Sequence, residues 1–346
     1  MKKSKLTIAG FMLAMLLGGY SSATAQNFDL NGDKVVDVAD ISALISYMAG
    51  SRQAPVIMNR VQTDAAKAKL NETGAQAIDL GLPSMRKWAD RNIGYSKDSK
   101  YGVYFAWGGL NWVAAKETNV DKGYVLEPGV SYDDKETAFN WKNYEWIDAG
   151  RVTWRGIYKY TIPDGVMNEG TDEVYWYDAD RNFTGDNLLY LEDEDDAAKF
   201  HWGAKWRMPN EEDFKELLQY TDQVWDTDQE ELQKGKSAKD AKGVWGCWFI
   251  GQNPGRDGLD WSSYKIFLPA AGDIEYQYVE YRIGQYIFPK GKYWAKQLDS
   301  HFGHDSSQAV VLNIGRKHCC DDEPNNEISF YERQYGLSIR PVLDDE

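Results

Sequence analysis

Residues 29–40 place oxygen-bearing groups at the positions that a twelve-residue calcium-binding loop uses. The segment reads Asp-Leu-Asn-Gly-Asp-Lys-Val-Val-Asp-Val-Ala-Asp. Ca²⁺ takes six to eight oxygen ligands at about 2.3–2.6 Å, and side chains at loop positions 1, 3, 5, 9 and 12 with a carbonyl at position 7 form such a set. The predicted ligands are the side chains of Asp29, Asn31, Asp33, Asp37 and Asp40 and the backbone carbonyl of Val35. The sequence therefore predicts a Ca²⁺ site near its N-terminus.

An apolar stripe at helical spacing follows the loop and predicts a short amphipathic helix over residues 38–48. The stripe consists of Ile41, Leu44, Ile45 and Met48. Loop and helix resemble one EF-hand-like repeat of a type I dockerin, the module that binds cohesins. Position 6, usually glycine, is Lys34, and the sequence contains one such repeat where a dockerin has two. Cohesin docking and a calcium-bound helix that only caps the next domain are both open interpretations.

The first 25 residues are typical of a secretory signal peptide. Three lysines at positions 2, 3 and 5 precede an apolar stretch over residues 8–17, and Ala23-Thr24-Ala25 forms a small-x-small cleavage site. We therefore expect a mature chain that starts at Gln26 and is exported to the periplasm, the cell surface or the medium. No later stretch reaches the about 20 apolar residues of a membrane span, so we expect no membrane span.

The charge of the chain excludes some partners. The formal net charge is −15, and removal of the three leader lysines lowers it to −18. Such a surface repels nucleic acid and anionic membranes, so neither is an expected partner. The sequence does not indicate an oligomeric state.

Few residues point to catalysis. The chain lacks a Gly-x-Ser-x-Gly elbow, a His-Glu-x-x-His helix, a P-loop and a dinucleotide fingerprint, so we assign no catalytic residue. Acidic pairs are numerous, but no spacing marks a glycosidase pair. One group of residues allows two interpretations, a site for a transition metal or a set of ordinary loop residues. The group consists of His301, His304, Asp305, His318, Cys319 and Cys320. The three cysteines allow at most one expected disulfide, from Cys247 to Cys319 or Cys320.

The mature chain divides into a calcium loop and helix (26–50), a polar linker (51–76) and a large domain (77–346), with a loop-rich insertion at 110–187. Asp195 and Asp196 predict the start of a helix that Gly203 ends. Asn210 with Asp213 predicts a capping box for a second helix, whose buried face is Phe214, Leu217 and Leu218. Short strands are expected near residue 77 and at residues 205–209, 266–269, 293–294, 309–314 and 336–342. Short strands, turns and two helices indicate an α+β domain with antiparallel sheet.

Ordered sequence blocks carry a family resemblance across residues 77–343. They read Ile-Asp-Leu-Gly-Leu-Pro-Ser (78–84), Lys-Trp-Ala (87–89), Asn-Ile-Gly (92–94), Tyr-Gly-Val-Tyr-Phe-Ala-Trp-Gly (101–108), Asp-Asp-Ala-Ala (195–198), Trp-Gly (202–203), Trp-Arg-Met-Pro (206–209), Ile-Phe-Leu-Pro-Ala-Ala-Gly (266–272), Gly-Lys-Tyr-Trp (291–294) and Tyr-Gly-Leu-Ser-Ile-Arg-Pro-Val (335–342). This set resembles the Fibrobacter succinogenes major paralogous domain, found in exported proteins of Bacteroidetes and Fibrobacter. The resemblance implies a C-type-lectin-like fold of the kind that formylglycine-generating enzymes use. Its first and last strands would pair, and its insertion would present a surface.

The matched blocks favour structural roles for their residues. Gly81, Gly94, Gly102, Gly108 and Gly272 are expected where the backbone turns or approaches a neighbour. Trp88, Trp107, Trp202, Trp206 and Trp294 are expected in the core. Arg207 and Arg340 are expected to be buried and paired with carboxylates, with Asp195 or Asp196 as the partner of Arg207. The copper-binding cysteine motif of the formylglycine-generating branch is absent, so that activity is not implied.

Three functions fit these features. The first is an exported, non-catalytic surface or secreted protein whose insertion binds a glycan or a protein. The second is a dockerin-bearing component of a polysaccharide-degrading assembly that could cleave glycans. The third is a purely structural cell-surface protein. Aromatic residues make up 14% of the chain, which fits either a core rich in rings or rings exposed for a ligand.

Overall fold

The computed structural model divides the chain into two compact units, residues 1–61 and 62–346. All the residues that the structure describes lie in the second unit. They are residue 70 and residues 74–96, 101–119, 123–127, 139–148, 153–163, 174–227, 245–274, 290–300, 306–316 and 324–343. The predicted calcium loop, its helix, the leader and the cluster at 301–305 and 317–320 lie outside these ranges.

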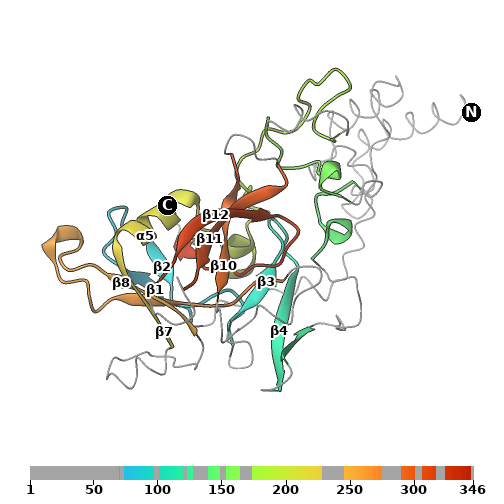
Figure 1. The fold of residues 1–346 in the computed structure, drawn as a ribbon. Helices are drawn as coiled ribbons and strands as arrows, with labels where there is room; N and C mark the ends of the chain where they lie inside the picture. The colour runs from blue at the N-terminus through green and yellow to red at the C-terminus, as the bar shows by residue number, and fades with distance from the viewer. Residues whose placement is uncertain are drawn as a thin grey trace, which may run out of the picture. The chain divides into compact units, whose positions relative to one another are not determined.

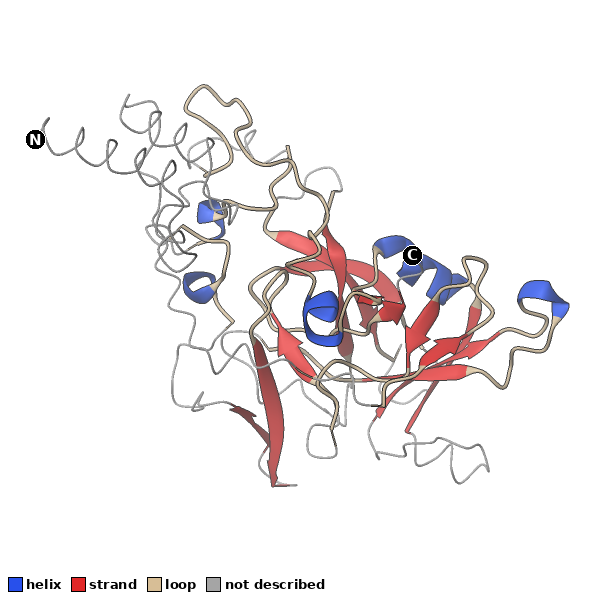
Figure 2. Ribbon diagram, turned by 180° about the vertical axis from the view of Figure 1, so that it is seen from behind, coloured by secondary structure: helices blue, strands red, loops and turns tan. Residues whose placement is uncertain are grey.

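The described part is built mostly of short strands paired antiparallel, with two α-helices (Figure 1). A four-stranded sheet has the order β1-β2-β13-β6, and three sheets have three strands each. The four-stranded sheet comprises β1 (Ala77–Asp79), β2 (Lys87–Ala89), β13 (Val342–Leu343) and β6 (Trp206–Arg207). One three-stranded sheet comprises β3 (Val103–Phe105), β4 (Trp112–Asn119) and β5 (Gly123–Glu127). Another comprises β7 (Thr221–Thr227), β8 (Trp245–Gly251) and β9 (Lys265–Pro269). The last comprises β10 (Gly291–Leu298), β11 (Gln308–Ile314) and β12 (Glu327–Glu332). Figure 2 shows how much coil joins these strands.

Both predicted helices form, and their predicted caps are confirmed. Helix α4 (Ala197–Trp202) starts where Asp196 accepts hydrogen bonds from the backbone N–H groups of Ala198 and Lys199. It ends at Gly203, whose φ of 96° suits glycine. Helix α5 (Glu211–Gln219) opens with a complete capping box between Asn210 and Asp213. These local signals determine the helix ends because each involves residues only a few positions apart.

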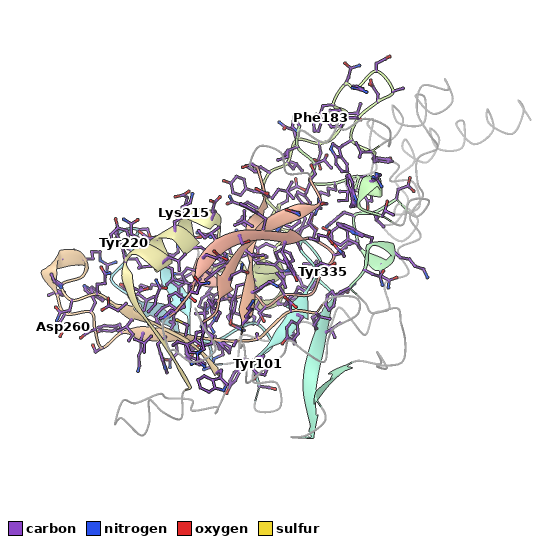
Figure 3. All side chains as sticks on the ribbon, viewed as in Figure 1. Tyr101, Phe183, Lys215, Tyr220, Asp260 and Tyr335 are labelled. Carbon is purple, nitrogen blue, oxygen red and sulfur yellow. The ribbon has the colours of Figure 1, made fainter. Side chains whose placement is uncertain are left out.

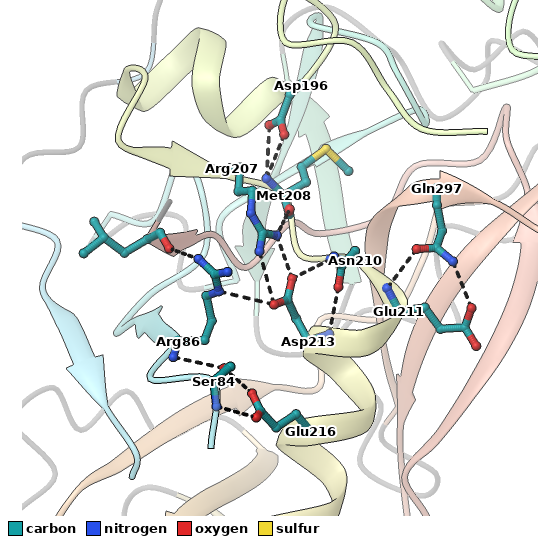
Figure 4. A network of polar contacts seen from close by, with 11 residues as sticks. Ser84, Arg86, Asp196, Arg207, Met208, Asn210, Glu211, Asp213, Glu216 and Gln297 are labelled. Atoms are coloured by element: carbon teal, nitrogen blue, oxygen red, sulfur yellow. Dashed lines mark hydrogen bonds and ion pairs between the residues drawn. The ribbon is translucent and has the colours of Figure 1, made fainter. Parts of the chain in front are cut away.

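The buried partner of Arg207 is Asp213, so the expected pairing with Asp195 or Asp196 is wrong (Figure 4). The guanidinium donates to both carboxylate oxygens of Asp213, at 2.6 and 3.2 Å. Asp196 is already occupied, because besides capping α4 it accepts the backbone N–H of Met208 at 2.9 Å. Asp213 therefore serves both the capping box and the ion pair.

Arg340 is also buried, but it contacts no carboxylate among the described residues, so that expectation is wrong too. It donates to the Asn92 side-chain oxygen at 2.8 Å, the Ala89 carbonyl at 3.0 Å and the Phe267 carbonyl at 2.8 Å. Burial lowers the pKa of Arg340 to about 10. Neutral acceptors from two segments, residues 89–92 and Phe267, satisfy this guanidinium, which ties both segments to its own.

The first and last strands share a sheet but are not neighbours, in contrast to what the resemblance implied. The turn after β1 folds β2 back so that Ala77 pairs with Ala89, and β2 then lies between β1 and β13. Val342 of β13 pairs with Trp88 on one side and Arg207 on the other.

The tryptophans of the matched blocks are buried, and the glycines of those blocks lie where the backbone turns, as predicted. All five tryptophans are buried, and all five glycines have φ between 69° and 84°. Gly102 shows the reason, since a Cβ there would lie 2.4 Å from the carbonyl oxygen of Ile93. Two tryptophans interlock β3 with β10: the indole of Trp107 donates to the Ala295 carbonyl and that of Trp294 to the Phe105 carbonyl, each at 2.8 Å.

Strands β7, β8 and β12 were not expected from the sequence, and β4 is longer than the short strands expected of the insertion. Strand β7 is mostly polar, and Trp225 is its one fully buried ring. Its seven residues pair in register with β8, which supplies the buried face. Partners distant in sequence thus stabilise strands that have no local signal.

Trp294→Phe should lower the free energy of unfolding by about 1 kcal/mol more than Trp88→Phe does. Both indoles are fully buried and lose the same volume. Only Trp294 loses a hydrogen bond, because the Trp88 indole N–H has no acceptor among the described residues. Urea denaturation of the two variants measures the difference, and equal losses would contradict it.

Candidate functional site

A buried guanidinium, that of Arg333 directly after β12, binds the insertion to the rest of the domain. Its Nε donates to the Tyr144 hydroxyl at 2.8 Å, and its Nη1 donates to the carbonyls of Tyr160 and Ser306 at 2.8 and 2.9 Å. Its Nη2 donates to the Lys159 carbonyl at 3.0 Å. All four acceptors are neutral, and three of them belong to the insertion. Arg333 therefore holds two separate parts of the insertion in place.

Neutral hydroxyl groups fit this arrangement. Burial raises the pKa of Tyr144 to about 12, although the neighbouring Arg333 acts in the opposite direction. The Tyr144 hydroxyl can therefore accept from Arg333 while it donates to the Trp107 carbonyl at 2.9 Å. The guanidinium also lies over the Trp107 ring, 4.7 Å from its centroid, so it makes a cation–π contact.

A second charged group joins the insertion to the start of α4. The Lys159 ammonium lies 2.7 Å from carboxylate oxygens of Asp195 and Glu192, and the Tyr160 hydroxyl donates to Asp195 at 2.6 Å. Burial by itself would lower the pKa of Lys159, but the hydrogen bonds to the two carboxylates outweigh it and raise the pKa. Burial also raises the pKa of Tyr160, and the Asp195 carboxylate adds to that shift. Lys159 is thus a bound cation that positions Asp195.

A chain of aromatic rings runs from the core to the surface of the insertion. Buried Trp107 contacts Tyr160 with ring centroids 5.3 Å apart, and Tyr160 contacts Trp146 at 5.8 Å. Trp146 contacts Tyr158 at 6.2 Å, and Tyr158 contacts Tyr175 at 6.4 Å. The last ring, Tyr175, is 38% exposed. These edge-on contacts are a favourable geometry for aromatic pairs, so the exposed ring stands on a rigid support.

The outer part of the insertion has a small apolar core of its own. Ile147, Ile157, Val174 and Trp176 form this buried cluster. Ile147 and Ile157 also form an antiparallel bridge, and half-buried Trp154 packs against Trp176 at 6.0 Å. The insertion is therefore a packed unit, and Phe183 marks its outer part in Figure 3.

The structure assigns a role to a residue that the sequence analysis did not single out, and the predicted calcium ligands lie outside the residues that it describes. Arg333 was not singled out, because its insertion partners lie 173 to 189 positions away and no local motif marks them. The predicted ligands Asp29, Asn31, Asp33, Val35, Asp37 and Asp40 lie outside the described residues. Within the described residues, no group of three or more His, Cys, Asp or Glu side chains could hold a metal.

Cys247 is a free, buried thiol, so the expected disulfide to Cys319 or Cys320 is not made. Burial raises its pKa to about 12. Its sulfur accepts a hydrogen bond from the Asn326 amide at 3.2 Å. A buried, protonated thiol is a packing group and a poor nucleophile.

No family model, curated protein or solved structure matches this chain. No helix among the described residues is long and apolar enough to cross a membrane.

Arg333→Lys should lower the free energy of unfolding by about 3 kcal/mol. A lysine ammonium cannot reach four acceptors spread around a planar guanidinium, so buried carbonyls lose their donor. Chemical denaturation followed by tryptophan fluorescence measures the loss.

Arg91→Lys is the matched control, because Arg91 lies nearer the surface than Arg333 and pairs with its sequence neighbour Asp90. It should cost less than about 1 kcal/mol. If the two variants lose the same stability, Arg333 is not the anchor of the insertion.

Proposed function

We propose that this protein is an exported, non-catalytic binding protein whose insertion presents Tyr175 and the rings around it to a glycan. The observation that carries the proposal is the chain of ring contacts that supports the exposed Tyr175 from Trp107 in the core. Sugar rings have apolar C–H faces that pack on aromatic rings. A ring that is already fixed loses little entropy when a ligand binds.

The charge of the chain favours a neutral glycan. With a net charge of −15, the protein repels polyanions such as uronic-acid polymers at low ionic strength. Lys159, which lies over the Trp146 and Tyr160 rings, is already bound to two carboxylates. Neutral hexose polymers avoid this repulsion and offer the flat C–H faces that a tyrosine binds.

The family assignment is part of this proposal. The antiparallel sheets and the two helices support a C-type-lectin-like domain of the Fibrobacter major paralogous type. In such a domain a looped insertion is the natural binding surface, since the scaffold holds it rigidly and its sequence can vary.

Tyr175→Ala should weaken binding of a neutral oligosaccharide about tenfold, since the loss of one stacking ring corresponds to about 1.4 kcal/mol. A neutral glycan array identifies the ligand, and calorimetric titration measures the affinity. Tyr220→Ala is the matched control, because its ring is equally exposed at 38% but lies at the end of α5. An equal loss in both variants, or no neutral glycan bound by the wild type, would refute the proposal.

A calcium-binding half-dockerin is a second part of the proposed function, and the register of ligands in residues 29–40 supports it. It would bind Ca²⁺ and connect the domain to a cohesin-bearing scaffold or stabilise the N-terminal segment. The two roles differ in one observation, since only the first predicts calcium-dependent capture by a cohesin.

Ca²⁺ should bind the mature chain at one site and raise its melting temperature, because a ligand that binds only the folded state stabilises it. The Asp29→Ala/Asp33→Ala variant should lose both effects, as should removal of Ca²⁺ with a chelator. Calorimetric titration and thermal melts measure them. Absence of Ca²⁺ binding by the wild-type chain, or Ca²⁺ binding by the variant, would overturn the calcium assignment.

A further inference from the structure

The loop between β8 and β9, residues 252–264, is seated against the domain with unusually close packing. Its Trp261 fits into a cradle of three glycines, where an added Cβ would collide with it. The Cβ would lie 2.5 Å from the indole at Gly81, 2.0 Å from it at Gly255, and 2.6 Å from the Trp261 carbonyl oxygen at Gly251. The indole N–H also donates to the Arg256 carbonyl at 2.6 Å. This loop is therefore held rigidly.

The same loop is joined to the turn between β1 and β2. The Arg256 backbone N–H donates to the Gly81 carbonyl at 3.2 Å, and its Nη1 donates to the Leu82 carbonyl at 3.2 Å. Its Nη2 lies 2.8 Å from a carboxylate oxygen of Asp79, and the guanidinium stacks on Trp261 at 4.9 Å. These contacts bind residues 255–264 to the start of that turn, and residues 82–86 and 255–264 are together called the loop surface.

The loop surface exposes large apolar side chains to water. Met85 is 60% exposed, Leu259 58% and Tyr264 48%, the three highest values among the large apolar residues that the structure describes. The Tyr264 ring rests on Trp261 with centroids 5.3 Å apart. Met85 and Asp257 have φ of 62° and 66°, a conformation that costs residues other than glycine about 1 kcal/mol or more. Exposed apolar groups on a rigid, strained support mark an interaction surface.

The exposed charges beside these residues are acidic. The Asp257 side chain is 62% exposed, and Asp260, labelled at the tip of the loop in Figure 3, is also exposed. Asp260 is oriented by hydrogen bonds from Ser262, whose backbone N–H donates at 2.9 Å. Arg256 is half-buried and already bound to Asp79 and Asp257. A partner that fits this surface therefore carries positive charge next to an apolar group.

We propose that the loop surface docks a protein segment that places an apolar anchor residue within two or three positions of lysine or arginine. A protein fits better than a sugar, because Met85 and Leu259 lack the flat ring on which a sugar packs. Methionine and tyrosine are also enriched in protein interfaces. This inference does not depend on the glycan proposal, since it concerns other residues.

The test is a peptide-display selection on the mature chain. Recovered peptides should combine Leu, Phe or Trp with adjacent Lys or Arg, and higher salt should weaken their binding. Leu259→Ser/Tyr264→Ser should reduce their affinity at least tenfold, and Asp257→Asn/Asp260→Asn should reduce both affinity and salt dependence. These side chains are exposed, so unchanged melting temperatures will show that the variants are folded. Tyr175→Ala should bind the peptides as the wild type does.

Three results would overturn the proposal. The first is a selection that recovers no such motif. The second is a set of recovered peptides that bind the Leu259→Ser/Tyr264→Ser variant as tightly as the wild type. The third is a neutral oligosaccharide whose binding is lost in that variant and retained in Tyr175→Ala, which would make this surface a sugar site. None of these results depends on whether Tyr175 binds a glycan.

Discussion

The position of the insertion depends on the burial of one positive charge. Arg333 is fully buried, and its four hydrogen-bond acceptors among the described residues are neutral oxygens. A buried charge without enough hydrogen bonds costs several kcal/mol, so these acceptors must stay together for the domain to be stable. Two of them are carbonyls of consecutive insertion residues, Lys159 and Tyr160. The guanidinium thereby fixes the backbone at Tyr160, through whose ring the chain of ring contacts passes from Trp107 towards Tyr175.

Short strands explain why such arginines are needed. Strands of two or three residues, such as β6 and β1, form few ladder hydrogen bonds with their neighbours in the four-stranded sheet. Arg340 binds carbonyls of β2 and β9, and Arg207 binds Asp213 of α5 from the neighbouring strand β6. Each arginine is a planar group with several donors, which lets one side chain join segments from different sheets.

The proposed glycan surface around Tyr175 and the loop surface have one feature in common: a buried aromatic ring supports an exposed one. Tyr175 is supported through Tyr158 and Trp146, and Tyr264 rests on Trp261 in its glycine cradle. The first surface is an aromatic platform suited to a neutral sugar, and the second is aliphatic and acidic, suited to a basic protein segment. Rigid support reduces the entropy lost on binding in both cases.

The sequence alone determined the features whose causes lie within a few residues. These are the caps of α4 and α5, the positive φ of the family-like glycines, and the burial of the tryptophans in the matched blocks. It also indicated antiparallel strands with two helices, because short strand patterns and two capped helices are visible in the residue order.

Tertiary structure decided the partners of the buried arginines, the place of β2 between β1 and β13, and the free state of Cys247. Arg340 shows the reason, because its acceptors Asn92 and Phe267 lie 248 and 73 positions away. A carboxylate close in sequence, such as Asp196 for Arg207, can already be occupied by backbone N–H groups. Competition among acceptors is settled only when the chain has folded, and no local pattern records its outcome.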